Sequence, residues 1–248
     1  MEITFVSPPR NLSGGNRVIA IPADLLAKRG HDVTVMAPQH RKPSRLEHIR
    51  ALSHGRSLRE PSLESHFESM AARLLLLPHY GPVTAADTPD ADVVIATWWE
   101  TAFTVAHFPP EKGRKFYFVL HHEVHSHLPV HLAAGSYHLP LKKITIASWL
   151  VEAMRDHYGD NDVALLPNAV DHSLFFARER DREAVPTIGL MYASTSFKGT
   201  GIALKAIELA RQDHPDLPTV ALGNTLPTRT LPLPLGTEFH LRPPQDEL

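Results

Sequence analysis

The sequence predicts an α/β protein with largely parallel sheets, and three observations lead to this class. The chain opens with an apolar strand-like run, a glycine turn, a helical stretch and a second apolar run, all within residues 3–38. Several later apolar runs are continuous rather than alternating, as expected for strands that are covered on both faces. Strand-like and helical stretches then keep alternating, and the alternation restarts after residue 186. This order is typical of parallel strands joined by helical crossovers.

The individual elements follow from short apolar runs and from helix start and stop signals. Ser148 can cap a helix that ends at Gly159, and a second helix is predicted from Gly201 to Arg211. Pro22 should kink the helix that follows the first strand. The predicted strands are Ile3–Val6, Val33–Met36, Val93–Ala96, Phe116–Leu120, Ile144–Ala147, Ala164–Leu166, Thr187–Tyr192, Thr219–Leu222 and Glu238–Leu241.

Residues 39–77 do not fit this alternation. They are polar, rich in Arg, Ser and His, and lack a clean period before Phe67. We therefore expect a long, mobile loop over the carboxyl edge of the sheet. This loop is a candidate lid over a bound acceptor.

A domain boundary is predicted after Val170, which gives domains 1–170 and 171–248. The segment 168–186 contains a charged stretch, Arg178–Glu183, with little apolar content, and a new apolar strand follows it. A chain of 248 residues is long enough for one large or two modest domains.

The composition excludes several classes of function. The 25 basic and 27 acidic residues nearly cancel, so nothing indicates a nucleic-acid partner, and the lack of cysteine excludes disulfides and thiolate chemistry. The chain enters a strand within two residues, and no apolar run approaches the roughly 18–20 residues that span a bilayer. We expect a cytoplasmic protein, and a peripheral contact with the cytosolic face of a membrane is left open.

The segment Ser13–Arg17 carries two adjacent glycines, Gly14 and Gly15, directly before the first helical stretch. Glycines at this place let backbone N–H groups approach a phosphate or a sugar with no Cβ in the way. A tight strand–helix connection without a ligand is the alternative. The spacing is not G-x-G-x-x-G, and no acidic residue stands about twenty positions on, so this is not a dinucleotide fingerprint.

Taken in order, the motifs of the chain resemble those of family 4 glycosyltransferases. The resemblance implies the GT-B architecture, in which two Rossmann-like domains face each other across a cleft. It covers nearly the whole chain except residues 39–80. The matching stretches are Gly14–Gly15, Leu26–Val35, Ala91–Trp98, Lys143–Gly159, Pro167–Phe175 and Gly189–Thr200.

The family's pair of glutamates eight positions apart is absent before the last residue, Leu248. The resemblance thus implies that the second domain is incomplete, and we expect little or no transferase activity from this polypeptide.

The resemblance assigns four residues to the nucleotide-sugar donor. Gly14 and Gly15 match the glycine-rich loop near the donor diphosphate, and Lys198 and Gly199 match the family's Lys-Gly that binds donor phosphate. A cation near a helix start neutralises charge that builds on the leaving diphosphate. The family usually carries an arginine a few residues before this lysine. The corresponding stretch here, Ala193–Ser196, contains none. An exposed lysine in a turn is the alternative for Lys198.

A histidine-rich run, residues 121–127, follows the strand Phe116–Leu120. The resemblance implies that His121 or His122 contacts the transferred sugar, where a neutral imidazole can bind hydroxyls and stabilise positive character at the anomeric carbon. A metal site is the rival interpretation, because with His131 six potential ligands lie within eleven residues. The spacing fits neither H-E-x-x-H nor a zinc finger, and the resembled enzymes need no metal. Solvated loop histidines are the third interpretation.

Trp98, Trp99 and Glu100 end another strand at the same sheet edge and are candidates for acceptor binding. Aromatic faces stack on sugar rings, and a carboxylate accepts hydrogen bonds from acceptor hydroxyls. The alternative is that at least one of the tryptophans packs in the core.

The resemblance as a whole implies a glycosyltransferase, or a fragment of one. It would move a sugar from a nucleotide-diphosphate sugar, its co-substrate, to a glycan or lipid-linked acceptor with retention at the anomeric centre and without a metal or other cofactor. A homodimer through an exposed apolar face is left open. The rival functions are a catalytically inactive remnant that binds a glycan or a partner transferase, and a histidine-rich metalloenzyme.

Overall fold

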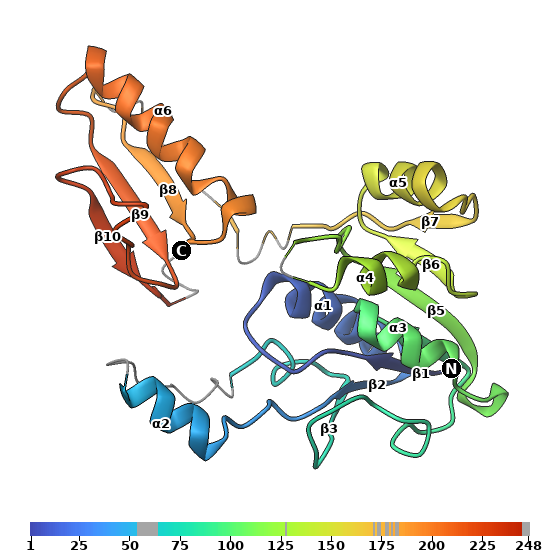
Figure 1. Cartoon of the computed structure of the whole chain (residues 1–248). Coiled ribbons are helices and arrows are strands. Elements are labelled where there is room, and N and C mark those ends of the chain that lie inside the picture. Colours follow the sequence, from blue (N-terminus) through green and yellow to red (C-terminus); the bar gives the residue numbers. More distant parts are fainter. Residues whose placement is uncertain are drawn as a thin grey trace. The chain divides into compact units, whose positions relative to one another are not determined.

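The computed structural model describes residues 1–53, 64–126, 128–170, 172, 175–176, 179, 181 and 184–244, with only the backbone of His48 and Phe197. The chain divides into two compact units, Met1–Ala169 and Val170–Leu248 (Figure 1). The division lies one residue before the boundary predicted after Val170.

Unit 1 (Met1–Ala169) is built on a parallel sheet, which has seven strands in the described part of the chain, in the order β3-β2-β1-β4-β5-β6-β7 (Figure 1). Chain order reverses between the neighbours β1 and β4. Such a reversal is the point at which open α/β sheets bind ligands, at the carboxyl ends of the strands. The strands are β1 (Glu2–Val6), β2 (Asp32–Ala37), β3 (Arg73–Leu76), β4 (Val93–Ala96), β5 (Arg114–Val119), β6 (Lys142–Thr145) and β7 (Val163–Leu165).

Helices cover both faces of this sheet, which explains why its strands read as continuous apolar runs. Helix α1 (Gly14–Lys28) packs on one face, where Ile19 and Ala23 join a buried cluster with Phe5 and Val35. The opposite face is covered by α3 (Trp99–Ala106), α4 (Val130–Ser136) and α5 (Ser148–Tyr158). The buried residues of this second cluster include Val6, Val94, Val105, Tyr137, Leu150 and Met154.

Unit 2 (Val170–Leu248) contains a smaller parallel sheet in the order β10-β9-β8. Its strands are β8 (Ile188–Tyr192), β9 (Thr219–Gly223) and β10 (Glu238–Leu241). A 3-10 turn, η2 (Ser196–Lys198), leads into helix α6 (Thr200–Asp213). Leu190, Ile207 and Ala221 form the buried core between helix and sheet.

The largest difference from the sequence prediction lies in residues 39–77. This stretch contains helix α2 (Arg45–Ser53) and strand β3, where the sequence predicted an irregular excursion. Strand β3 is short and lies at the sheet edge, where its apolar run Leu74–Leu76 is half-buried. Residues 54–63 of the predicted lid lie outside the described residues.

Two smaller features of unit 1 also differ from expectation. Ser148 is the first residue of α5 rather than its cap, because Ala147 holds the extended N-cap position. Strand β6 begins and ends two residues earlier than predicted. Helix α1 continues through Pro22, and the kink expected there stays a prediction. Among the residues that the structure describes, the helices are too short or too polar to cross a membrane.

Candidate functional site

The predicted residues of unit 1 come together because they follow neighbouring strands of the parallel sheet. Ala96 of β4 pairs with Val6 of β1 on one side and with Tyr117 of β5 on the other. The Thr97 hydroxyl donates a hydrogen bond to the Val6 carbonyl oxygen at 2.9 Å, which ties the ends of β1 and β4 together. The loops after β1, β4 and β5 therefore meet at the carboxyl edge, at the reversal of strand order.

Gly14 and Gly15 are the first two residues of helix α1 and are exposed. Ser13 caps the helix, and its hydroxyl oxygen accepts a hydrogen bond from the Asn16 N–H at 3.3 Å. A Cβ at Gly14 would meet no atom within 4 Å, and one at Gly15 only the Ser13 hydroxyl oxygen at 3.8 Å. The fold therefore does not require glycine here. The two glycines leave the positive end of the helix dipole open to an anion.

The motif Trp98–Glu100 forms the start of helix α3, with Trp98 at the N-cap. The Thr101 hydroxyl oxygen accepts hydrogen bonds from the N–H groups of Thr97 and Trp98 at 3.0 and 2.9 Å. Trp99 is only 8% exposed, whereas Trp98 is half-buried and Glu100 exposed. Trp98 and Glu100 are thus the members of the motif that retain accessible surface. The buried Trp99 indole N–H has no hydrogen-bond partner among the described residues.

His121 and His122 have different environments. His121 is exposed, and its ring lies 5.6 Å from the ring of Trp149, at the start of α5. His122 is half-buried, and its Nε2 lies 2.7 Å from the Tyr158 hydroxyl oxygen. Burial lowers the pKa of His122, and the neighbouring histidines, His157 first, lower it further. His122 is therefore held as a neutral imidazole at pH 7, the form that can exchange hydrogen bonds with a sugar hydroxyl.

Glu123 is the residue that sequence reasoning missed, because it was considered only as one potential metal ligand in the histidine-rich run. It is 5% exposed, and its Oε2 accepts a hydrogen bond from the Trp99 N–H at 3.2 Å. Its own N–H donates to the Tyr137 hydroxyl oxygen at 2.8 Å. Burial raises the pKa of Glu123 to about 8, opposed only by the hydrogen bond from Trp99. The signal in the sequence is an acidic residue three positions after the predicted apolar strand Phe116–Leu120.

The metal interpretation gains no support from the residues that the structure describes. Among them, no group of three or more His, Asp or Glu side chains is arranged to hold a metal ion. His127, one of the six potential ligands, lies outside the described residues.

Lys198 and Gly199 belong to unit 2, at the start of helix α6. Lys198 ends the 3-10 turn η2 and is exposed. Gly199 has a φ of +75° and holds the N-cap position of α6, a backbone conformation that favours glycine. The Thr200 hydroxyl accepts a hydrogen bond from the Ala193 N–H at 3.0 Å, which fixes the loop after β8 to the helix start.

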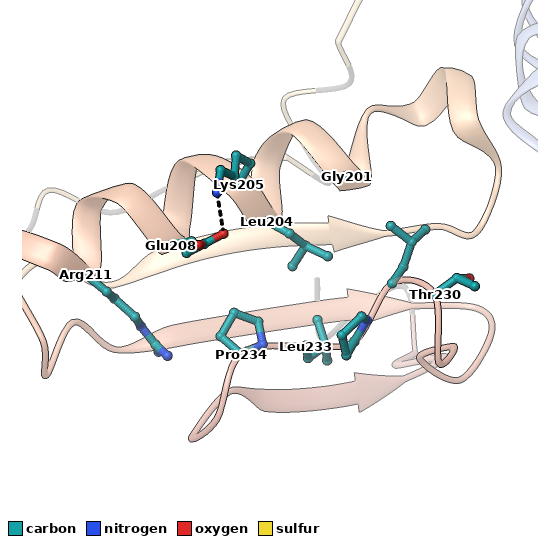
Figure 2. A pocket seen from close by; sticks show the side chains of 10 residues that line it. Gly201, Leu204, Lys205, Glu208, Arg211, Thr230, Leu233 and Pro234 are labelled. Carbon is teal, nitrogen blue, oxygen red and sulfur yellow. Dashed lines mark hydrogen bonds and ion pairs between the residues drawn. The ribbon is translucent and has the colours of Figure 1, made fainter.

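A cavity of about 470 Å³ lies elsewhere in unit 2, between α6 and the segment from Thr230 to Pro234 (Figure 2). Its charged side chains are engaged within the protein. Lys205 pairs with Glu208 at 2.9 Å, and Arg211 donates hydrogen bonds to backbone carbonyl oxygens. The remaining lining is mainly leucine and proline. This cavity contains none of the predicted site residues, and we assign it no part in the site.

The structure is similar to those of solved glycosyltransferases. A glycosyltransferase from Rickettsia africae ESF-5 aligns over 90% of this chain with 15% identity and a TM-score of 0.54. WaaG, a glycosyltransferase involved in lipopolysaccharide biosynthesis, aligns over 96% of the chain with 13% identity and a TM-score of 0.56. The chain spans 60% of the Rickettsia protein and 70% of WaaG. No protein-family model matches the sequence, and no curated protein matches it significantly.

Proposed function

We propose, on the premise of this GT-B glycosyltransferase fold, that the chain is all or part of a sugar transferase. The reaction is the transfer of a sugar from a nucleotide-diphosphate sugar to a glycan or lipid-linked acceptor. The observation that carries the proposal is that three groups follow the neighbouring strands β1, β4 and β5 at one sheet edge: the open start of α1, the Trp98–Glu100 motif and the His121–His122 pair. This edge lies at the reversal of strand order, where α/β sheets bind their ligands.

Each group has a distinct part in the proposed reaction. The N–H groups at Gly14 and Gly15 and the Lys198 ammonium offer positive charge to the diphosphate, which gains negative charge as it leaves. The neutral imidazole of His122, or the exposed side chain of His121, contacts the sugar. Trp98 and Glu100 meet the acceptor. Catalysis in this scheme comes from positioning and charge stabilisation rather than from a protein nucleophile.

Retention at the anomeric centre and independence of a metal extend the family resemblance and belong to the proposal. In a retaining reaction of this kind, the leaving phosphate assists the incoming acceptor hydroxyl on the same face of the sugar. Cytoplasmic localisation, a peripheral membrane contact and a homodimer stay predictions from the sequence.

Calorimetric titration with UDP-glucose, GDP-mannose and dTDP-rhamnose, together with a donor-hydrolysis assay, tests the proposal. We expect one of these donors to bind, and the Lys198→Ala variant to weaken its binding about tenfold or more, because a cation facing the diphosphate is lost. Lys205→Ala is the matched control, since Lys205 is an exposed lysine on the same unit that pairs with Glu208.

Failure of all three donors to bind would contradict the proposal. Donor binding without hydrolysis or transfer would instead support the catalytically inactive binding module.

A further inference from the structure

Glu123 connects two loops that the proposed reaction needs side by side. Its side chain reaches from the loop after β5 to the start of α3, where its Oε2 accepts the Trp99 N–H at 3.2 Å. The two residues are 24 positions apart in the sequence. No other residue of the His121–Glu123 turn is buried to this degree.

The start of α3 needs such a partner because its own residues offer the Trp99 N–H no acceptor. The first N–H groups of a helix have no acceptor within the helix. The Trp98 side chain makes no capping hydrogen bond, and Thr101 serves the N–H groups of Thr97 and Trp98, which precede the helix. The Trp99 N–H is therefore satisfied from outside, by Glu123.

The backbone at Glu123 is fixed in turn. The Glu123 N–H donates to the Tyr137 hydroxyl oxygen at 2.8 Å, and the Tyr137 hydroxyl donates to the His121 carbonyl oxygen at 3.1 Å. Tyr137 itself is 1% exposed and its ring stacks on Tyr117 at 5.8 Å between centroids. A continuous chain of hydrogen bonds thus runs from the start of α3 through Glu123 and Tyr137 to His121.

We infer that Glu123 is a positioning residue that holds the Trp98–Glu100 motif and the His121–His122 pair in one fixed geometry, and so sets how the acceptor meets the sugar. The inference rests on the proposed function. Glu123 does not act on substrate itself, because its side chain is buried behind the residues that retain accessible surface.

The surroundings of Glu123 favour the neutral acid in this role. Among the described residues, the titratable groups that face it are the Tyr117 hydroxyl, from β5, and the Tyr137 hydroxyl, from the C-cap of α4. Helix α3 contributes the Trp99 N–H. None of these groups is a cation, and burial raises the pKa of Glu123 accordingly. A glutamine at this position would keep the acceptor oxygen without the charge, whereas an alanine would leave the Trp99 N–H buried and unpaired.

Backbone amide exchange, measured by NMR on the full chain, tests the connection without any substrate. In the Glu123→Ala variant we expect the Trp99 amide to exchange at least tenfold faster than in the parent chain, and in Glu123→Gln to stay within about threefold. The Asn16 amide, capped by Ser13, serves as the internal reference. Unchanged exchange at Trp99 in Glu123→Ala would overturn the inference.

Two further variants keep the test decisive. Tyr137→Phe replaces Glu123→Ala in the test if Glu123→Ala does not fold. It removes the hydroxyl that bonds to the Glu123 and His121 backbones, so the Glu123 amide should exchange faster. Glu152→Ala, on the exposed side of α5, is the control for loss of an acidic residue and should change neither amide.

Donor hydrolysis separates a positioning role from a merely structural one. With whichever of UDP-glucose, GDP-mannose and dTDP-rhamnose binds, Glu123→Ala should lower kcat at least tenfold with donor Kd within twofold, and Glu123→Gln should retain kcat within threefold. Faster exchange at Trp99 with unchanged kcat would overturn the positioning role. If a donor binds but the parent chain does not hydrolyse it, the positioning role in a reaction is overturned. If none of the donors binds, the proposed function fails. In both cases the Trp99 amide still decides whether Glu123 joins the two loops.

Discussion

Helices α1 and α3 follow the neighbouring strands β1 and β4. The first turns of the two helices differ in exposure and in the groups that bind their N–H groups. The start of α1 is exposed, begins with Gly14 and Gly15, and is capped by the Ser13 hydroxyl. The start of α3 is closed by Thr101 and by the buried Glu123. The start of α1 thus remains accessible to an anion, whereas the start of α3 holds the loop after β5 through Glu123.

The largest expected effect concerns the closed start and its dependence on pH. The pKa of Glu123 is raised to about 8 in the folded chain from 4.5, so its contribution to stability is fully present below pH 4.5 and is lost as the pH rises through about 8. Glu123→Gln has no such charge. Relative to this variant, the parent chain should lose about 2 kcal/mol or more of unfolding free energy between pH 5 and pH 8.

Urea unfolding of both proteins at several pH values measures this difference. Parallel stability curves for the parent chain and Glu123→Gln would show that Glu123 is not buried as a neutral acid. Ser13 does not titrate in this range, so a Ser13→Ala variant should follow the pH dependence of the parent chain.

A smaller effect is expected at the open start itself. Ser13→Ala removes the hydroxyl that accepts the Asn16 N–H and should lower the unfolding free energy by about 1 kcal/mol. Urea unfolding at constant pH measures it. A loss of unfolding free energy as large as that of Glu123→Ala would mean that the start of α1 is packed rather than open.

The parts of the fold that the sequence predicted are those with a strong local pattern. Strands β4 and β10 coincide with their predicted bounds, and Gly159 ends α5 in the left-handed conformation that its residue type favours. Strand β3 was missed although Leu74–Leu76 form an apolar run, because so short a run does not by itself distinguish a strand from a helix. Its parallel pairing with β2 decides the structure.

The candidate site was predictable only in part, for a similar reason. The glycines and histidines could be assigned to strand ends because parallel strands bring their carboxyl ends to one edge. The burial of Glu123 could not be predicted, since it depends on Tyr137 and Trp99 arriving from two other elements. The different exposures of Trp98 and Trp99 are likewise set by packing against the sheet.

The smallest expected effect on stability is at Gly14. A methyl group there meets no atom within 4 Å, and alanine favours the helix, so Gly14→Ala should be neutral or stabilising by up to about 0.5 kcal/mol. Thermal unfolding measures the stability. The same methyl group would hinder a diphosphate from reaching the N–H groups at the helix start. Donor affinity in the calorimetric titration should therefore fall while stability does not. A clear destabilisation would indicate that the glycine serves the fold.

The contrast between the open and the closed helix start is tested most directly by an NMR titration of the full chain with UDP-glucose, GDP-mannose and dTDP-rhamnose. With a donor that binds, the amide signals of Gly14 and Gly15 should shift in a saturable manner, and the Trp99 amide should stay protected from exchange throughout. Saturable binding that leaves the Gly14 and Gly15 signals unmoved would contradict the account.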